Sequence, residues 1–420
     1  LNYFTAITLK LSPLPSEKVM GVCHFPTFYE AMNAAQHLVT LNPVAVELID
    51  ETMIKLARNI SIFKKTVEEV VNGNPEALLV VEFAESSNEK NLKKLSRLDE
   101  MMKNLGFSWK NKKGGLIKIS NKILQGNVTE MRKSGLNIMM SMKTEQKPVS
   151  FVEDCAVKLE NLADYTNDLK NIFKKYDVEG TWYAHASVGC LHVRPVLNMK
   201  LKQDVSKMRN IAEEASKLIK KYHGSFSGEH GDGIVRSEFI EVMFGKKMNK
   251  IFKQIKNSFD PSNIFNPRKI IDAPKMDDRN YFRFSPGYEA KNINTILDWS
   301  AWKGKSSGLQ GAVEMCNNNG ACRKLDNGVM CPSYRVTLDE KDSTRGRANT
   351  LRLALTGQLG KDALTSKKMT ETMELCVSCK ACKRECPTGV DMAKMKVEIS
   401  HLKNKKYGLS LNERMIAFLP

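Results

Sequence analysis

The pattern of apolar and polar residues predicts an alternation of strands and helices in the first part of the chain. Residues 3–11 alternate as a strand does and end at a turn containing two prolines. Residues 27–40 carry apolar side chains along one helical face, and 88–106 repeat close to every 3.6 residues. Between these helices, 76–83 is a strand-like apolar run. Strand, helix, strand and helix at these lengths predict an α+β fold.

A second round of elements follows. We expect a strand at 149–157, a helix at 160–175, a strand pair at 179–197, and helices at 203–222 and 246–259. A polar stretch with little periodicity then runs from Asp272 to Tyr288 and is typical of a linker. The chain beyond it is cysteine-rich and helical, so we place a domain boundary near residue 280.

The chain carries 65 Lys and Arg against 47 Asp and Glu, a net charge of +18. This balance favours anionic partners, such as a carboxylate substrate, an acidic redox protein or an anionic membrane face, although a solvated lysine-rich surface explains it equally well. Only 7% of residues are aromatic, so we expect no nucleic-acid partner. No apolar run reaches the roughly 18 residues that a transmembrane helix needs. The missing initiator Met and the apolar last residues lead us to expect further sequence at both ends.

Cysteine spacing gives the strongest chemical signal. Cys376-Val-Ser-Cys379-Lys-Ala-Cys382-Lys-Arg-Glu-Cys386-Pro matches the ferredoxin run C-x2-C-x2-C-x3-C-P. In two-cluster ferredoxins the fourth cysteine of each run ligates the other cluster. We therefore expect one complete 4Fe–4S cluster on Cys376, Cys379 and Cys382, with Cys331 as the fourth ligand. A zinc site is the alternative, but zinc usually takes two separated ligand pairs.

The upstream cysteines are incomplete. Cys316, Cys322 and Cys331 resemble the same motif with Asn319 in place of one cysteine. A second site on Cys316, Cys322 and Cys386 would need a non-cysteine ligand, a three-iron cluster or a cysteine beyond the last residue. The alternative is that Cys316 and Cys322 are structural thiols that bind no cluster. Free, clustered thiols suit a reducing compartment, which favours the cytoplasm.

Two histidine clusters precede the linker. One contains His185 and His192 around Ser187-Val-Gly189, and the other is Glu229-His230-Gly-Asp-Gly. A turn at 187–189 would bring both rings of the first cluster together. Two imidazoles and Glu229 would then make a three-ligand metal site suited to Lewis-acid chemistry, with His230 as a general base. Hydrogen-bonded core residues are the alternative reading.

These two clusters, followed by Phe259-Asp-Pro-Ser-Asn-Ile-Phe-Asn266-Pro, resemble the C-terminal domain of FAD-linked oxidases of the vanillyl-alcohol-oxidase type. The resemblance covers roughly residues 1–272. Together with the cysteine-rich segment, the chain is most similar to the bacterial iron–sulfur D-2-hydroxyglutarate dehydrogenases. Met131-Arg132-Lys133 and the stretch from Lys147 to Val157 fit that subgroup.

The resemblance implies a domain plan. Residues 1–14 would be the end of a FAD-binding domain whose glycine-rich part we expect to precede Leu1. Residues 15–275 would form the ferredoxin-like α+β substrate and metal domain, an antiparallel sheet with helices. Residues 285–420 would form an α-helical ferredoxin-type 4Fe–4S domain that continues beyond 420.

The resemblance also implies residue roles. His185, His192 and Glu229 would bind a divalent metal, usually zinc, and His230 would be the base. Arg132 would clamp a substrate carboxylate, which suits its planar guanidinium. Three further assignments concern single positions: Asn266 is expected to touch the flavin, Lys147 is a loose match to the substrate lysine, and Arg194 replaces the usual asparagine. An extra cation at Arg194 would grip a second carboxylate.

The implied function is oxidation of D-2-hydroxyglutarate to 2-oxoglutarate, with hydride passing to FAD and electrons leaving through the 4Fe–4S cluster. The expected partners are the 2-hydroxy carboxylate, an electron-transfer protein or quinone, and further copies of the chain in a homo-oligomer. The expected location is the cytoplasm, including the periphery of the inner membrane. The alternatives are a D-lactate or glycolate dehydrogenase of the same build, and a non-catalytic electron-transfer subunit that docks to a flavoprotein.

Overall fold

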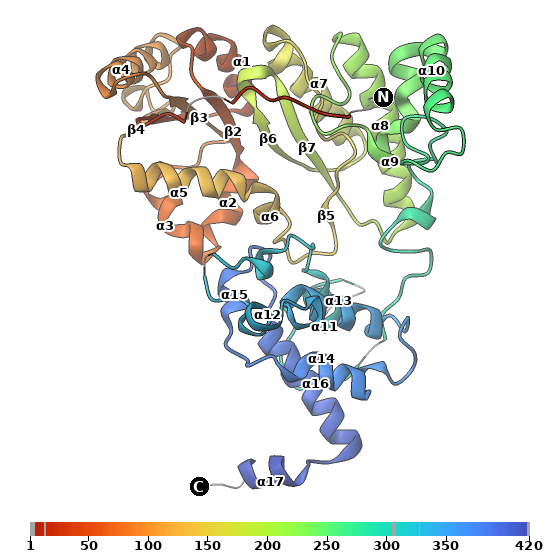
Figure 1. Cartoon of the computed structure of the whole chain (residues 1–420). Helices are drawn as coiled ribbons and strands as arrows, with labels where there is room; N and C mark the ends of the chain where they lie inside the picture. Colours follow the sequence, from red (N-terminus) through yellow and green to blue (C-terminus); the bar gives the residue numbers. More distant parts are fainter. Residues whose placement is uncertain (1–4, 12–13, 292, 305–307, 327, 418–420) are drawn as a thin grey trace. The chain divides into compact units, whose positions relative to one another are not determined.

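The computed structural model describes residues 5–11, 14–291, 293–304, 308–326 and 328–417 (Figure 1). The chain forms two compact units. The first contains residues 1–59, 63–135 and 148–285, and the second contains 60–62, 136–147 and 286–420. The sequence pattern does not anticipate that 136–147 belong with the cysteine-rich unit. Asn317 in that unit donates a hydrogen bond to Asn137 Oδ1 at 3.1 Å.

The first unit is built on a seven-stranded sheet in the order β4-β1-β3-β2-β6-β7-β5. The strands are β1 Val19–Phe25, β2 Ala45–Asp50, β3 Ala77–Phe83, β4 Gly115–Ile119, β5 Lys147–Pro148, β6 Gly180–His185 and β7 Cys190–Leu197. Neighbouring strands from β4 to β7 run antiparallel. The predicted α+β fold, an antiparallel sheet with helices, is therefore confirmed.

Four long helices cover one face of this sheet (Figure 1). The main hydrophobic core lies between these helices and the sheet. The four helices are α1 Phe28–Leu38, α4 Asn88–Asn104, α7 Leu162–Lys175 and α8 Lys202–Lys221. Thr27 and Glu30 form a capping box that begins α1. Met32 from α1 and Leu98 from α4 are buried with β3 residues such as Leu79, because alternate strand side chains point to one face.

The opposite face of the sheet carries a cavity. It is lined by strand residues that alternate with the core positions, among them Met20, Glu47 and Val80. Helix α5, Lys122–Lys133, contributes Val128 and Arg132 to the same cavity. The remaining helices of this part are α2 Glu51–Arg58, α3 Ser61–Val70, α9 Gly233–Arg236 and α10 Ile240–Phe259, whereas α6 Gly135–Met139 falls almost entirely in the second unit.

Most elements expected from periodicity are present. The structure confirms the helices predicted at 27–40, 88–106, 160–175, 203–222 and 246–259, and the strands at 76–83 and 179–197. The last of these helices belongs to α10, which begins earlier and is kinked at Gly245.

Two predicted strands are wrong. The described residues 5–11 form no strand. Residues 149–157 run beside β7 through single bonds, such as Val193 N–H to Glu153 O at 2.9 Å, rather than as a regular ladder. The strands β1, β2 and β4 were not predicted. β4 is the short end strand of the sheet, and β1 is buried along its whole length, so it lacks the alternation that marks a half-exposed strand.

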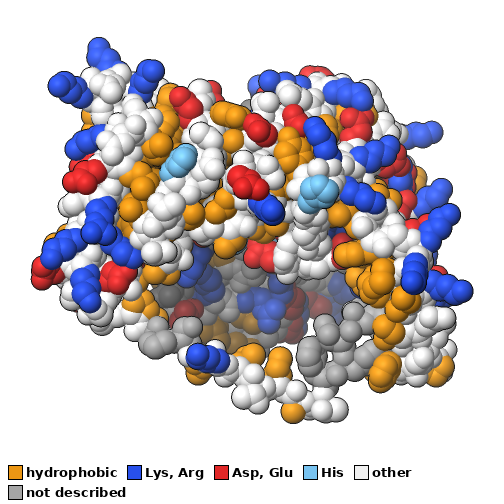
Figure 2. All heavy atoms as spheres, turned by 90° about the horizontal axis from the view of Figure 1, so that it is seen from above, with side chains coloured by type: hydrophobic (Ala, Val, Ile, Leu, Met, Phe, Trp, Pro, Cys, Tyr) orange, Lys and Arg blue, Asp and Glu red, His pale blue; other side chains and the backbone are white. Residues whose placement is uncertain are grey.

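The second unit is helical, as expected. Its helices are α11 Leu309–Glu314, α12 Pro332–Thr337, α13 Thr344–Leu355, α14 Lys367–Glu374, α15 Ala381–Glu385, α16 Met392–Tyr407 and α17 Leu411–Ala417. They enclose a small core that includes Val313, Leu351 and Met395, together with buried Cys322 and Cys382. Among the described residues, no helix is long and apolar enough to cross a membrane. Basic side chains on the face drawn in Figure 2 are interspersed with acidic and apolar ones.

Candidate functional site

The β6–β7 hairpin positions the first histidine cluster. A short 3-10 turn, Ala186–Val188, follows His185, and Gly189 then adopts a φ of 68°. A Cβ at Gly189 would lie 2.0 Å from Val157 O, so only glycine fits there. The strand register pairs Tyr183 with His192, which places His185 and His192 on the same face. Their ring centroids lie 5.0 Å apart, which confirms that the turn brings the two rings together.

Asp154 holds the second cluster against this hairpin. Its Oδ2 accepts hydrogen bonds from the backbone N–H of Glu229 at 2.8 Å and of His230 at 2.5 Å. Arg236 donates to Oδ1 of the same carboxylate. Burial opposes ionisation of Asp154, yet the two N–H groups and Arg236 lower its pKa. The ionised Asp154 therefore keeps Glu229 directed at the histidines.

Three potential metal ligands converge at this point. Glu229 Oε1 lies 3.0 Å from His192 Nε2 and 3.6 Å from His185 Nε2. Burial first, and the neighbouring His185 and His230 second, lower the pKa of His192 to about 3, so its ring stays neutral as a ligand must. The buried His192 Nδ1 has no hydrogen-bond partner among the described residues. Two imidazoles and a carboxylate at these separations suit a divalent metal such as zinc.

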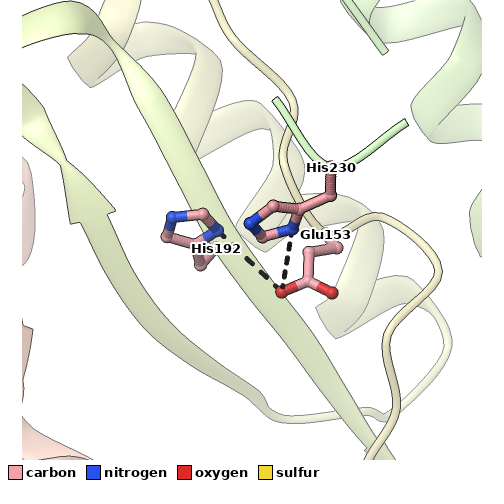
Figure 3. A group of neighbouring side chains, drawn as sticks. All are labelled: Glu153, His192 and His230. Carbon is pink, nitrogen blue, oxygen red and sulfur yellow. Dashed lines mark ion pairs between the residues drawn. The ribbon is translucent and has the colours of Figure 1, made fainter. Parts of the chain in front are cut away.

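His230 lies at the edge of the same cluster. Its ring stacks on His192 with centroids 4.9 Å apart and an interplanar angle of 14°. Glu153 Oε1 lies 3.7 Å from His230 Nδ1 and 3.9 Å from His192 Nδ1 (Figure 3). The side chain of His230 is 44% exposed, whereas that of His192 is 3% exposed. His230 is thus the histidine of this cluster that an incoming molecule reaches most easily.

Glu47 is a site residue that the sequence analysis missed. It lies on β2 directly opposite His185 in the sheet register. Its carboxylate accepts a hydrogen bond from His185 Nδ1 at 2.8 Å and one from Arg132 Nη2 at 2.6 Å. The bond to Glu47 raises the pKa of His185. A carboxylate between the apolar residues Val46 and Leu48 of this strand is the signal that points to it.

The cavity beside this cluster has a volume of about 260 Å³. It is lined by Glu47, Arg132, Lys133, His185 and Glu82, together with apolar residues of β1, β2, β3 and α5. Burial lowers the pKa of Arg132, and Glu47 opposes that effect. The cavity therefore presents two basic side chains, Arg132 and Lys133, and two carboxylates, Glu47 and Glu82, next to the histidine cluster.

The structure places Arg194 differently from its predicted role as a second substrate cation. Arg194 is 3% exposed and is not among the residues that line the cavity. It donates to Ser150 Oγ at 2.8 Å, to the Tyr183 hydroxyl at 2.5 Å and to Glu153. Arg194 therefore holds Glu153 beside the stacked histidines and lies outside the wall of this cavity.

Lys147 and Asn266 also lie outside the histidine cluster. Lys147 belongs to the second unit, where its ammonium donates to Met142 O and lies 3.4 Å from Met315 Sδ. These contacts disfavour a substrate role for Lys147. Asn266 is exposed and adopts a left-handed φ of 50°, next to Phe265, whose side chain is 67% exposed. The flavin contact of Asn266 stays a prediction.

The cysteines of the second unit gather as the spacing predicted. Cys331, Cys376, Cys379 and Cys382 line one pocket. The fully buried Arg347 places its Nη1 3.7 Å from Cys331 Sγ, and Thr344 Oγ1 lies 3.5 Å from the same sulfur. Donors aimed at a cluster thiolate tune its potential. Sequence reasoning missed both residues, because their proximity to Cys331 depends on how α13 packs.

The other three cysteines are less well defined as a site. Burial raises the pKa of Cys322, and the thiols of Cys331 and Cys386 add to this effect. Cys322 Sγ accepts a hydrogen bond from Arg345 N–H at 3.4 Å. Cys316 Sγ contacts Asn318 Oδ1 at 3.8 Å. A second cluster on Cys316, Cys322 and Cys386 stays a prediction with its alternatives open.

Comparison with known proteins gives two family matches. Residues 14–270 match the family described as FAD linked oxidases, C-terminal domain, and residues 312–390 match the 4Fe-4S dicluster domain. These matches support FAD and an iron–sulfur cluster as cofactors.

Individual relatives agree with these matches. The chain is 26% identical to a D-2-hydroxyglutarate dehydrogenase of Pseudomonas putida over 100% of this chain, and 28% identical to one of Escherichia coli over 99%. A D-lactate dehydrogenase of Archaeoglobus fulgidus is 24% identical over 64% of this chain and 55% of its own length. The chain spans 44% of the length of each of the first two relatives.

Proposed function

Because this chain belongs to the family of FAD-linked oxidases through their C-terminal domain, we propose that it forms the substrate and electron-exit portion of a 2-hydroxy-acid dehydrogenase. One observation carries this proposal. The ligand atoms of His185, His192 and Glu229 converge beside a cavity that Arg132 lines. A cation for the carboxylate and a Lewis-acid site for the hydroxyl are the two elements that recognition of a 2-hydroxy acid needs.

The proposed substrate is D-2-hydroxyglutarate. Relatives with that name match 99–100% of this chain, which supports the assignment. Two basic residues, Arg132 and Lys133, line the same cavity, so each carboxylate of a dicarboxylate has a cation within reach. Lys133 thereby takes the part that sequence reasoning gave to Arg194. D-lactate is the second candidate, because the Archaeoglobus fulgidus relative bears that activity in its name.

The contacts suggest a separate role for each residue of the site. Arg132, whose Nη2 is held by Glu47 and Ala184 O, binds the 1-carboxylate through Nη1 of its guanidinium. Glu47 accepts a hydrogen bond from His185 Nδ1–H, so Nε2 of that ring keeps its lone pair toward Glu229. His230, exposed at the edge, takes the hydroxyl proton on its ring. When bound, a divalent metal would polarise the hydroxyl and FAD would accept the hydride.

Flavin reduction tests the proposal. The holoprotein, purified without air, is mixed in turn with D-2-hydroxyglutarate, D-lactate and glycolate, with and without a chelator, while flavin absorbance is recorded. We expect bleaching by D-2-hydroxyglutarate that the chelator abolishes. Bleaching by D-lactate or glycolate alone would change the substrate assignment to that compound. Failure of all three to bleach the flavin, with an intact iron–sulfur spectrum, would overturn the dehydrogenase proposal in favour of an electron-transfer subunit.

A further inference from the structure

Glu153 lies beside two histidines of the site and has no part in the proposed function so far. Its Oε1 lies 3.7 Å from His230 Nδ1 and 3.9 Å from His192 Nδ1 (Figure 3). The two rings are stacked with an interplanar angle of 14°, so one carboxylate faces the same nitrogen of both rings. The side chain of Glu153 is 12% exposed, which leaves little water to compete for these contacts.

Arg194 fixes the position of this carboxylate. Its guanidinium donates to Glu153, to Ser150 Oγ at 2.8 Å and to the Tyr183 hydroxyl at 2.5 Å. The positive charge of Arg194 disfavours a metal ion on Glu153, although Glu153 and the two imidazoles are close enough to hold one. An ionised carboxylate offers about four lone-pair positions, so Arg194 leaves acceptor capacity for the rings. Glu153 is therefore a fixed acceptor directed at two histidines.

The other nitrogen of each ring faces the proposed metal site. Glu229 Oε1 lies 3.0 Å from His192 Nε2 and 4.0 Å from His230 Nε2. A neutral imidazole carries one proton, so a proton on Nδ1 leaves the lone pair on Nε2. His192 needs that lone pair to bind a metal, and its buried Nδ1 has no hydrogen-bond partner among the described residues. His230 needs the same lone pair to receive a proton from a substrate.

We propose that Glu153 is a positioning residue that holds the proton of neutral His230 on Nδ1, so that Nε2 receives the hydroxyl proton of the substrate. The inference rests on the role of base that the proposed function gives to His230. In that step the hydroxyl O–H bond breaks, an Nε2–H bond forms, and the ring becomes a cation whose Nδ1–H faces Glu153. The separation of 3.7 Å is longer than a hydrogen bond, as catalytic contacts often are before the substrate binds.

Nitrogen NMR tests the tautomer without relying on turnover. The zinc-loaded holoprotein is prepared with isotope-labelled histidine, and the signals of His230 are identified by their loss in His230→Gln. We expect the proton of neutral His230 on Nδ1 in the unmodified protein and in the control Ser150→Ala, which removes one contact of Arg194 but keeps the carboxylate. Glu153→Gln should move the proton toward Nε2, because an amide can present its own N–H to Nδ1. A proton on Nε2 in the unmodified protein would overturn the inference.

The limiting rate of flavin reduction tests the consequence of that tautomer. Stopped-flow mixing with increasing concentrations of D-2-hydroxyglutarate separates this rate from the apparent substrate Kd. Glu153→Gln should lower the limiting rate by about 100-fold, within the contribution of a general base, and change the Kd by less than about threefold. Glu153→Asp keeps the charge and should recover about tenfold of the lost rate, and Ser150→Ala should keep the rate of the unmodified protein.

The outcomes separate this inference from the proposed function. An equal loss of rate in Glu153→Gln and Ser150→Ala would overturn the positioning role, because loosened packing would explain both. A loss that appears only in the Kd would also overturn it, because Glu153 would then act in substrate binding. An unmodified protein whose flavin no substrate bleaches would overturn the proposed function, and the tautomer of His230 would still decide for or against Glu153.

Discussion

Glu47 Oε1 accepts a hydrogen bond from His185 Nδ1 at 2.8 Å across the β2–β6 strand pair. The second oxygen of the same carboxylate is held by Arg132 at 2.6 Å. Glu47 therefore sets the tautomer of a proposed metal ligand and also orients the proposed substrate cation. Carboxylate partners of this kind orient metal-bound histidines and raise their basicity.

Glu47→Gln should weaken metal binding by about 10–100-fold, because the amide no longer offers two negatively charged acceptors. Competition with a chromophoric chelator measures the affinity. Glu82→Gln is the matched control, since Glu82 lines the same cavity but pairs with Lys18 at 3.1 Å. An unchanged metal affinity in Glu47→Gln would contradict the positioning role.

Arg132→Lys should raise the KM for the 2-hydroxy acid by about 10–100-fold, the equivalent of a charge-assisted hydrogen bond of about 1.5–3 kcal/mol. A lysine keeps the charge but lacks the planar guanidinium that binds Glu47 through Nη2 while Nη1 stays available to the substrate carboxylate. Steady-state kinetics measure the effect.

Lys133→Ala should weaken the binding of D-2-hydroxyglutarate more than that of D-lactate, because only D-2-hydroxyglutarate has a second carboxylate. An equal effect on both substrates would contradict the role of Lys133.

The sequence predicts short-range geometry well and long-range pairing poorly. The turn that joins His185 to His192 and the run from Cys376 to Cys386 are encoded within a dozen residues each, so their spacing carries the information. Glu47 meets His185 only because β2 pairs with β6, 138 positions later in the chain. The true partner of Arg194 is Glu153, 41 positions away, on a segment that periodicity misread as a strand. Whether a charged side chain lies in a substrate site or in a buried ion pair depends on contacts with residues far away in the sequence. The local pattern of residues does not contain these contacts.

Asp154→Asn should destabilise the first unit by about 3 kcal/mol, since it leaves the buried Arg236 without its anionic partner. The pKa of Asp154 is lowered in the folded protein, so its contribution is present above the ordinary carboxyl pKa and is lost as pH falls through the folded value. Denaturant unfolding at pH 7 and at a pH well below the ordinary carboxyl pKa of about 3.9 measures the difference, which should be larger at pH 7. Asp168→Asn, on a 35%-exposed side chain, is the control. Equal stability of both variants at pH 7 would contradict the prediction.

Cys379→Ser should remove the iron of one cluster while flavin bleaching by substrate persists, because Cys379 lines the pocket with Cys331 and not the histidine site. Iron per protein and anaerobic bleaching measure the two effects. Cys23→Ser is the control, since Cys23 is buried in the core of the first unit. Retention of full iron by Cys379→Ser would exclude it as a ligand.

His24 should make the stability of the first unit fall as the solution is acidified below about pH 6.5. The side chain is 1% exposed, its Nδ1 contacts Val22 O at 3.0 Å, and its Nε2 accepts the Asn72 N–H at 3.1 Å. Burial lowers the pKa of His24 to about 4, whereas the backbone carbonyls of Val22, Gly115 and Val70 oppose this effect. Between about pH 6.5 and 4 the unfolded chain therefore binds a proton that the folded chain does not. The contribution of neutral His24 to the free energy of unfolding is fully present above this pH range, and about 3 kcal/mol of it is lost as the pH falls through the range.

His24→Gln removes the titrating ring and keeps an acceptor for Asn72, so it isolates that proton. We expect a variant that is less stable at pH 7 by about 1 kcal/mol. Its stability should then decline less than that of the unmodified protein between pH 7 and pH 5. Urea unfolding followed by tryptophan fluorescence measures both slopes, because Trp109 stands edge-on to His24 with ring centroids 4.9 Å apart. Identical slopes in the two proteins would show that other groups carry the acid sensitivity.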